Sequence, residues 1–136
     1  MRFNFPLLFI LLSLSIPSLG ETMDDLVTRE SLYYKKFTDV PFTGEVEGKE
    51  QGSFKDGKRD GRWRWYHDNG QLKDKLEYKE GKQEGRWVGY HKNGQLEFEG
   101  EYKDGKPEGP WVGYHEDGSI NEDITGTYKN GEKISD

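Results

Sequence analysis

The sequence has no cysteine among its 136 residues. Disulfide bonds, thiolate metal sites and thiol nucleophiles are therefore excluded together. A lipoprotein anchor is excluded as well, because it is attached to a cysteine. A folded domain of this composition has to be held together by packing, since no covalent cross-link supports it.

Positive charge is the next shortage. The chain carries 20 Lys and Arg residues against 26 Asp and Glu residues, which gives a formal net charge of −6. Nucleic acids and anionic lipid surfaces are bound through basic patches, so this balance argues against both as partners. Lys and Glu alternate along much of the chain, a pattern typical of a solvated surface.

Long apolar runs are also missing, with one exception at the N-terminus. Arg2 precedes an apolar run from Phe5 to Ile16, and residues 17–20 end in small residues where a signal peptidase reads the chain. A lone transmembrane anchor is the alternative, but the run is short for a span and no basic flank follows it. We expect residues 1–20 to be a signal peptide. The mature chain would then begin at Glu21, be exported to the bacterial periplasm or secreted, and keep no membrane span.

What the sequence does contain is a repeat. Trp63, Trp87 and Trp111 follow one another at steps of 24 residues, each two positions after a glycine. Further residues keep the same step: Tyr66, Tyr90 and Tyr114; His67, His91 and His115; Gly70, Gly94 and Gly118. A fixed period of this length predicts a repeat architecture, in which each unit buries its apolar face against its neighbours.

Each repeat carries two turn signals. The first is Asn93-Gly94 and its equivalents, typical of a two-residue hairpin loop in which both residues have positive φ. The second is a looser signal, of which Asp56-Gly57 and Asp104-Gly105 are examples. The segments between the turns are aromatic-rich and too short for stable isolated helices. Each repeat is therefore predicted to be a β-hairpin.

A two-residue loop at Asn93-Gly94 fixes the register of its hairpin. The directly opposed pairs, all on one face, are then His91/Leu96, Gly89/Phe98, Trp87/Gly100 and Gly85/Tyr102. A large side chain opposite a glycine can lie flat across the neighbouring strand. We expect one continuous aromatic ladder on this face, built from Phe54, Trp63, Tyr78, Trp87, Tyr102, Trp111 and Tyr128. The other face is expected to be charged and wet.

These residues resemble the MORN repeat, in the variant found in many bacterial proteins. The family pattern is present as Gly85-Arg86-Trp87-Val88-Gly89-Tyr90, then Asn93-Gly94, Tyr102 and the paired glycines Gly105 and Gly109. The resemblance covers roughly residues 42–133. It implies an all-β fold, an elongated single antiparallel sheet of successive β-hairpins. Some relatives carry the label antitoxin, so the resemblance also admits an antitoxin- or immunity-like inhibitor of a toxin.

The repeats divide the chain behind the leader. Residues 21–41 are an N-terminal segment, polar and expected to be loose at its start. Residues 42–60 are a degenerate capping repeat with a tight hairpin near Gly48 and Val46 in the tryptophan position. Residues 61–84 and 85–108 are the first and second repeats. Residues 109–136 form the third repeat and the C-terminal edge, with two additional residues before Tyr128. An even insertion keeps the same side chains on the inner face.

The histidines are the residues that most invite a chemical role, because all three occupy one repeat position: His67, His91 and His115. Equivalent side chains in successive hairpins are roughly 9–10 Å apart, which is too far to share a metal ion. We therefore predict strand-end packing against Leu72, Leu96 and Ile120, and no metal site.

The acidic column Asp60, Glu84 and Glu108 recurs on exposed turns, as a solubility feature would. Acid–base catalysis needs two carboxylates in distinct environments beside a pocket. The glycine-rich loops do not lead into a helix, as a phosphate-binding loop does. The sequence therefore predicts no catalytic residues, no cofactor and no enzyme.

What remains is surface. Trp65 has glycines at its repeat-equivalent positions, so the first hairpin carries one additional large ring. Together with Tyr66, Tyr90 and Tyr114 of the wet face, Trp65 is a possible partner contact. The predicted function is a non-catalytic protein-interaction module of the cell envelope. An antitoxin-like inhibitor and a glycan-binding module are the alternatives, and self-association stays open, because fold alone does not choose among them.

Overall fold

A computed structural model describes residues 20–136. The elements are β1 (Glu21–Thr22), the short 3-10 helix η1 (Met23–Asp25), β2 (Leu26–Arg29), β3 (Leu32–Lys35), β4 (Gly44–Glu47), β5 (Glu50–Lys55), β6 (Lys58–Tyr66), β7 (Leu72–Lys79), β8 (Lys82–Tyr90), β9 (Leu96–Lys103), β10 (Lys106–Gly113), β11 (Gly126–Lys129) and β12 (Glu132–Ser135). Within this range no helix has the length and apolar character needed to cross a membrane. The expected leader, apart from Gly20, lies outside the described residues.

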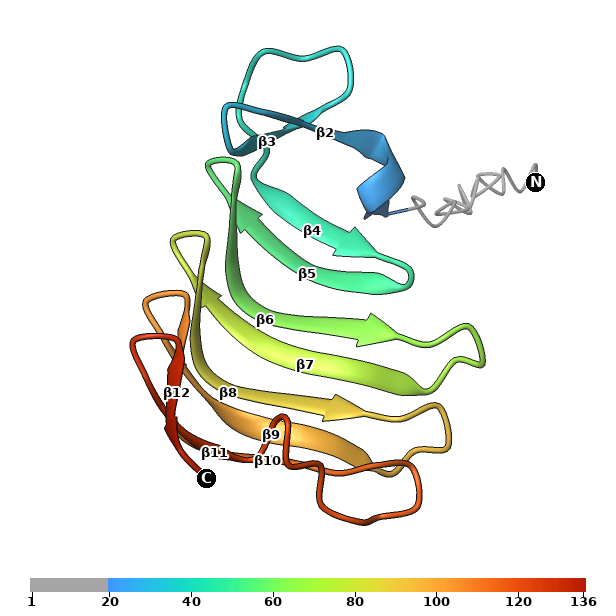
Figure 1. The fold of residues 1–136 in the computed structure, drawn as a ribbon. Helices are drawn as coiled ribbons and strands as arrows, with labels where there is room; N and C mark the ends of the chain where they lie inside the picture. The colour runs from blue at the N-terminus through green and yellow to red at the C-terminus, as the bar shows by residue number, and fades with distance from the viewer. Residues whose placement is uncertain (1–19) are drawn as a thin grey trace, which may run out of the picture.

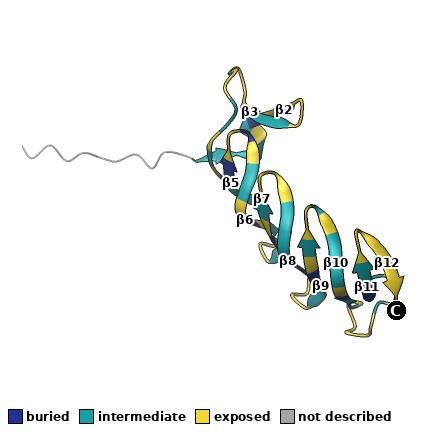
Figure 2. Cartoon of the chain, turned by 90° about the vertical axis from the view of Figure 1, so that its left-hand side faces the viewer, coloured by how far each residue is buried: buried dark blue, intermediate teal, exposed yellow. Residues whose placement is uncertain are grey.

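The strands form one long sheet of successive hairpins. It has ten strands in the order β1-β4-β5-β6-β7-β8-β9-β10-β11-β12, and all its pairings are antiparallel except that of β1 with β4. The long strands curve, and the hairpins follow one another in a single row (Figures 1 and 2). The predicted all-β fold is therefore confirmed. The structure also contains a second sheet that the sequence did not predict, the two-stranded hairpin β2–β3.

The N-terminal segment consists of regular elements from Glu21 to Lys35, where the sequence predicts a loose start. The hairpin β2–β3 lies at the first end of the long sheet (Figure 1). Tyr33 N donates to Gly57 O (2.8 Å), and Gly57 N donates to Phe42 O (2.8 Å). The first bond attaches the hairpin, and the second attaches the segment after it, to the turn between β5 and β6, a long-range contact that the local composition does not indicate.

The looser turn signal forms the two-residue loops. Lys55 pairs with Lys58 across Asp56-Gly57, and the two loop residues have φ values of 50° and 80°. Two positive φ angles identify the turn type whose twist matches that of the flanking strands. The equivalent loops behave in the same way: Glu80-Gly81, Asp104-Gly105 and Asn130-Gly131.

The Asn-Gly turns are longer than predicted. His91 N donates to Gln95 O (2.8 Å), so the loop has three residues, and of the Asn-Gly pair only Gly94 has positive φ. A bulge at the end of the hairpin compensates for the additional residue, because Tyr90 pairs with Leu96. The predicted pair His91/Leu96 is therefore wrong. Beyond the bulge the other predicted pairs are found: Gly89/Phe98, Trp87/Gly100 and Gly85/Tyr102.

A second bulge lies at the glycine–tryptophan motif of each repeat. In the β7–β8 pair the register shifts so that residues 85–87 of β8 oppose the single residue Leu76 of β7. The first residue of this bulge, Gly85, has a φ of 82°, and Gly61 and Gly109 have 75° and 77°. Glycine adopts this region without steric cost, and bulges of this kind bend and twist a strand. They account for the curvature of β6 and β8 in Figure 1.

The buried core is concentrated at the N-terminal end of the sheet. Leu26, Val46, Phe54 and Trp63 form one cluster of buried side chains. Val46, which takes the tryptophan position in the shortened repeat, is therefore part of this core. At the other end, Trp111 pairs with Gly126 and its ring lies 6.0 Å from that of Tyr128. The two additional residues of the third repeat thus leave the inner face unchanged, as predicted.

Candidate interaction surfaces

The aromatic residues in the first half of the sheet form a closed cluster. The ring centroid of Trp63 lies 5.0 Å from that of Phe54 and 6.1 Å from that of Tyr78. On the far side, the Tyr33 ring of β3 lies 4.8 Å from Phe54, and Phe42 packs on the same cluster. Trp63 is 0% exposed as a result.

A cation–π contact completes this first cluster. The Arg59 guanidinium lies 4.5 Å from the ring centroid of Trp63, and it forms an ion pair with Glu50 (3.1 Å). Contacts of this kind are favourable over a tryptophan face, especially when they are partly shielded from water. The residues equivalent to Arg59 in the next two repeats are Gln83 and Pro107, which carry no charge. The later repeats therefore lack this contact.

The second half of the sheet carries a more open aromatic cluster, which we call the C-terminal cluster: Trp87, Phe98, Tyr102, Trp111 and Tyr128. Their rings lie within about 6 Å of their neighbours, for example 6.2 Å between Trp87 and Trp111. Trp111 is buried, but the other four are only partly covered. The hairpin β2–β3 lies at the opposite end of the sheet (Figure 1).

The expected ladder is interrupted between these two clusters. Within residues 20–136 no ring contact joins Tyr78 to Trp87. The Trp87 ring instead lies 5.1 Å from the rings of both Phe98 and Tyr102. Its Nε1 donates to the carboxylate oxygen Oδ1 of Asp74 (3.3 Å). The seven predicted ladder residues thus belong to two separate stacks.

Leu76 explains the interruption. Trp63 lies flat across Gly52 and Trp111 lies flat across Gly100, so that a Cβ at either glycine would overlap the indole. The residue at this repeat position beside the central tryptophan is Leu76, which is 4% exposed. Its side chain occupies the space that a flat indole would need, and close-packed interiors do not accommodate both.

The structure also corrects which ring covers Gly100. The backbone pairs Gly100 with Trp87, as the register predicted, but the indole that crosses it belongs to Trp111 on the next strand. The bulge in β10 is the reason, because residues 109–111 together oppose Gly100. The glycine does accommodate a flat ring, and that ring comes from the other neighbouring strand.

Trp65 packs within the first cluster. Its ring centroid is 5.9 Å from that of Trp63, and its cross-strand partner is the small residue Asp74. In the second repeat the sizes are exchanged, since Gly89 stands opposite Phe98 and the Phe98 ring fills the space over the glycine. Each of these two hairpins thus has one large ring at this pair, from the first strand (Trp65) in one and from the second strand (Phe98) in the other. This packing accounts for Trp65 without a partner, and its role as a partner contact stays a prediction.

Asp74 is a carboxylate beside the C-terminal cluster. Burial raises the pKa of Asp74 above its ordinary value, and the positive charge of Lys73 and the indole hydrogen bond from Trp87 oppose this shift. A raised pKa in the folded state means that the native protein binds this proton more tightly than the unfolded chain does. The contribution to stability is then present at acidic pH and is lost as the pH rises through the folded-state pKa.

We therefore expect Asp74→Asn to raise the melting temperature at neutral pH. The amide keeps an oxygen that accepts from Trp87 and removes a charge that is partly buried. At acidic pH, where the wild-type carboxyl group is protonated, the two proteins should melt alike. Thermal melts over a pH series measure the difference. Equal melting temperatures at neutral pH would show that the ionised Asp74 carries no such penalty.

The histidines form a seam between repeats. His67 Nε2 lies 2.7 Å from Tyr90 O, and His91 Nε2 lies 2.8 Å from Tyr114 O. A carbonyl oxygen only accepts, so each Nε2 carries a proton and donates to the backbone of the following hairpin. His115 of the last repeat is exposed. Over residues 20–136 no group of three or more potential ligands is placed to hold a metal ion.

Replacing the seam histidines should weaken the stack according to position. His91→Ala removes a donor to a backbone carbonyl and should lower the free energy of unfolding by about 1 kcal/mol. His115→Ala, the matched control at the same repeat position, should change it by less than about 0.5 kcal/mol. Urea denaturation of both variants measures this difference. Equal losses would contradict a role for the histidine as a link between repeats.

The Asn-Gly loops add a second link between repeats. Asn69 Oδ1 accepts from the backbone of its own loop (3.0 Å), and its Nδ2 donates to Lys92 O (2.9 Å) in the next loop. Asn93 makes the equivalent pair of hydrogen bonds. In the last repeat, Asp117 keeps the acceptor role but has no amide to donate. The motif therefore specifies both the turn and its stacking.

The acidic column has a structural role that its recurrence on exposed turns did not indicate. Glu84 Oε2 accepts from Asp104 N, and Glu108 Oε2 accepts from Asn130 N, each at 2.9 Å. Both carboxylates thus hold the two-residue turn of the following repeat.

The predicted contact residues Tyr66, Tyr90 and Tyr114 lie toward the other edge of the sheet, where each is partly exposed. Their role in contacting a partner also stays a prediction.

Comparison with known proteins agrees with the repeat. Residues 59–80 and 83–104 match the MORN repeat variant family. These two adjacent segments are MORN repeats of the variant type, which confirms for them the resemblance drawn from the sequence. The first segment covers hairpin β6–β7 and the second covers hairpin β8–β9. No curated protein matches the chain.

Among solved structures, the chain has some similarity to one described as "Crystal structure of GtfA/B complex bound to UDP and GlcNAc". The two are 11% identical with a TM-score of 0.24, and the match covers 75% of this chain and 21% of that chain. The chain thus spans about a fifth of the length of the protein it matches. At this TM-score the similarity supports no conclusion about fold or ligand.

Proposed function

We propose that this protein is an exported, non-catalytic repeat module that binds another protein in the cell envelope. MORN repeats fit a protein-interaction module, because a stack of hairpins presents one continuous, rigid surface. The leader pattern of residues 1–20 supports export. An antitoxin-like inhibitor is the form this function would take if the partner were a toxin acting outside the cytoplasm.

The observation that carries the proposal is the contrast between the two aromatic clusters. The first is covered by hairpin β2–β3 and by Arg59, and its central Trp63 is fully buried. The outer rings of both clusters are partly exposed. The difference lies at the centre, where Phe54 and Trp63 are 2% and 0% exposed, whereas Trp87 of the C-terminal cluster, at the same repeat position as Trp63, keeps exposed surface. Exposed aromatic surface of this kind is typical of a site of protein contact.

A capture experiment with matched variants tests this proposal. The protein, expressed from its full sequence, serves as bait in an envelope extract, and captured proteins are identified by mass spectrometry. We expect a specific protein that is retained by the wild type and lost with Trp87→Gln, because this ring is partly exposed in the C-terminal cluster. Purified partner and calorimetry then confirm direct binding, and thermal melts confirm that the variant is folded.

The control is the triple variant Tyr66→Ser, Tyr90→Ser and Tyr114→Ser at the seam edge. Loss of capture in the triple variant with full capture by Trp87→Gln would move the contact to that edge and contradict the role of the cluster. Retention of the bait on isolated cell wall, without a captured protein, would favour the glycan-binding alternative. An exported form whose sequence starts at Met1 instead of Glu21 would contradict the leader assignment.

A further inference from the structure

A row of side chains crosses the polar face of the sheet, on the opposite side from the tryptophans. Each member is the backbone partner of the next: Gln51, Arg64, Lys75, Val88, Glu99 and Val112. Directly opposed residues on one face have Cβ atoms about 5 Å apart, so their side chains interact. The charges in this row therefore determine what that face can bind.

Arg64 and Lys75 are directly opposed in this row, although both are cationic. Both are exposed, and in the described part of the chain neither is within ion-pair distance of a carboxylate. Neighbouring arginines do have acidic partners, as Arg62 does in Glu77 (3.2 Å). Like charges placed directly opposite one another are destabilising. This arrangement therefore has a cost within the isolated chain.

The pair also departs from the repeat. One repeat later the equivalent residues are Val88 and Glu99, so the opposed cations occur in the first hairpin alone among these two repeats. Lysines are also opposed across the two-residue turns, for example Lys79 and Lys82. Those pairs recur from hairpin to hairpin at the strand ends, beside the acidic residues of the turns. Arg64 and Lys75 lie within their strands, away from the two-residue turns.

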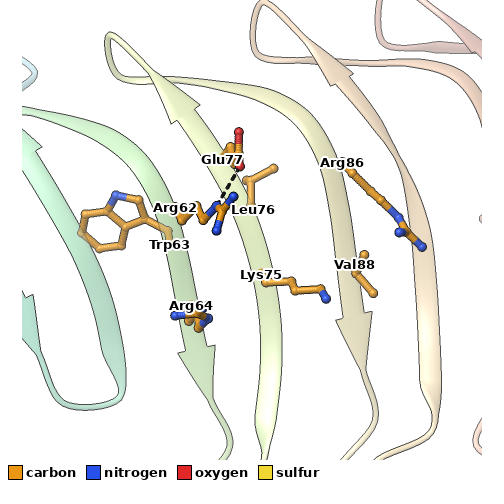
Figure 3. A pocket seen from close by; sticks show the side chains of 8 residues that line it. All are labelled: Arg62, Trp63, Arg64, Lys75, Leu76, Glu77, Arg86 and Val88. Carbon is orange, nitrogen blue, oxygen red and sulfur yellow. Dashed lines mark hydrogen bonds and ion pairs between the residues drawn. The ribbon is translucent and has the colours of Figure 1, made fainter.

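The two residues lie in a hollow in which four of the eight lining residues are basic. Figure 3 shows Arg64 and Lys75 on β6 and β7, and Val88 on β8, with the remaining cations above them. Arg62 and Arg86 are the other two cations of this lining; Arg62 is paired with Glu77 and Arg86 with Glu99, so Arg64 and Lys75 are its two cations outside an ion pair. Val88 is 2% exposed and provides an apolar floor. A concentration of positive charge in a chain of net charge −6 is a local feature rather than a consequence of composition.

We propose that Arg64 and Lys75 bind a carboxylate of an acidic polypeptide segment in the partner protein. The inference rests on the proposed function only in taking a protein as the partner. A guanidinium fork and an ammonium facing one another can share one carboxylate, which then relieves their mutual repulsion. The repulsion that destabilises the free protein is thus relieved on binding and favours the complex.

The width of the basic area favours a polypeptide. Three strands at about 4.8 Å spacing span roughly 10 Å, the scale of one extended segment. Glu45 and Glu47 line the hollow on one side of Arg62 and Arg64, while Glu99 and Glu101 line that on the far side of Arg86. A membrane surface or a nucleic-acid duplex would press its phosphates against these flanking carboxylates. An acidic segment confined to the basic strip avoids them.

The test uses a fluorescein-labelled peptide of ten glutamates as the probe, with binding followed by fluorescence polarisation at low salt. We expect Arg64→Ser/Lys75→Ser to weaken binding by about tenfold or more, because charge-assisted hydrogen bonds are lost. The matched control Lys79→Ser/Lys82→Ser removes the same charge from a turn and should leave binding nearly unchanged. Equal losses in the two double variants would reduce the effect to general charge attraction and overturn the proposal.

Lys75→Glu gives a second readout that loss of folding cannot imitate. It converts the opposed cations into an ion pair, so the melting temperature should rise while peptide binding is lost. A lower melting temperature would overturn the argument that the pair is held at a cost.

Other outcomes would identify other occupants. If inorganic phosphate displaced the peptide more strongly than chloride at the same ionic strength, the site would be a small-anion site instead. A salt-sensitive dimer abolished by Lys75→Glu would identify a second copy as the occupant. If the capture from the envelope extract failed while the glutamate peptide bound as expected, only the proposed function would be contradicted.

Discussion

Trp63→Ala is expected to lower the free energy of unfolding by about 3–5 kcal/mol, the usual range for removing a fully buried large aromatic side chain. Trp63 is 0% exposed and joins Phe54, Tyr78 and Arg59 in one cluster. Its Nε1 also donates to Ser53 O (3.1 Å), which would lose this partner. Chemical denaturation of wild type and variant measures the loss, and a small domain has little stability in excess of it.

Trp87→Ala is the matched control. Trp87 occupies the same repeat position but is partly exposed, so its removal uncovers less apolar surface and solvent can enter the space. We expect a clearly smaller loss than at Trp63, although the repeat alone would predict equal losses at both tryptophans. A Trp87→Ala variant as unstable as Trp63→Ala would contradict the two-cluster description of the aromatic face.

Gly100→Ala is expected to cost about 1–3 kcal/mol, the range for overpacking a well-packed site. Its backbone does not have positive φ, so the cost comes from side-chain crowding rather than from backbone strain. The added Cβ would overlap the Trp111 indole, which lies flat across this position. Thermal and urea melts of the single variant give the size of the effect.

Double variants identify the ring that meets the new Cβ. Gly100→Ala combined with Trp111→Ala should cost much less than the sum of the two single changes, because the clash is removed with the indole. Gly100→Ala combined with Trp87→Ala should be nearly additive. Coupling to Trp87 in place of Trp111 would restore the arrangement that the register alone suggested.

Whether a feature of this protein can be predicted depends on how close in sequence the residues that form it lie. The 24-residue step, the strands and the alternation of faces follow from residues close in sequence, and they were predictable. The sequence also predicts the pairing of Trp87 with Gly100, although it predicts a loop that is one residue too short. The bulge at Tyr90 compensates for that residue, so the predicted face was right despite the wrong turn type.

The candidate surfaces were less predictable, because they depend on which strand supplies each ring. A single substitution in the repeat, Leu76 for glycine, separates the ladder into two clusters. The signal was present as a departure from the period at positions 52, 76 and 100. The effect of this departure on the ladder can be predicted only if the bulges are known, because they place Trp63 and Trp111 over the preceding strand. The opposed cations Arg64 and Lys75 likewise departed from the period but were visible as a pair only in the register.

The sequence by itself determined that this protein is a row of β-hairpins with one aromatic and one charged face, because hairpin pairing and side-chain alternation are short-range. Only the tertiary structure decided that hairpin β2–β3 closes one aromatic cluster and leaves the other open. It also revealed that histidine, asparagine and glutamate side chains connect each hairpin to the next. These contacts join residues about 20 or more positions apart, and the packing of whole hairpins, rather than any local preference, brings them together.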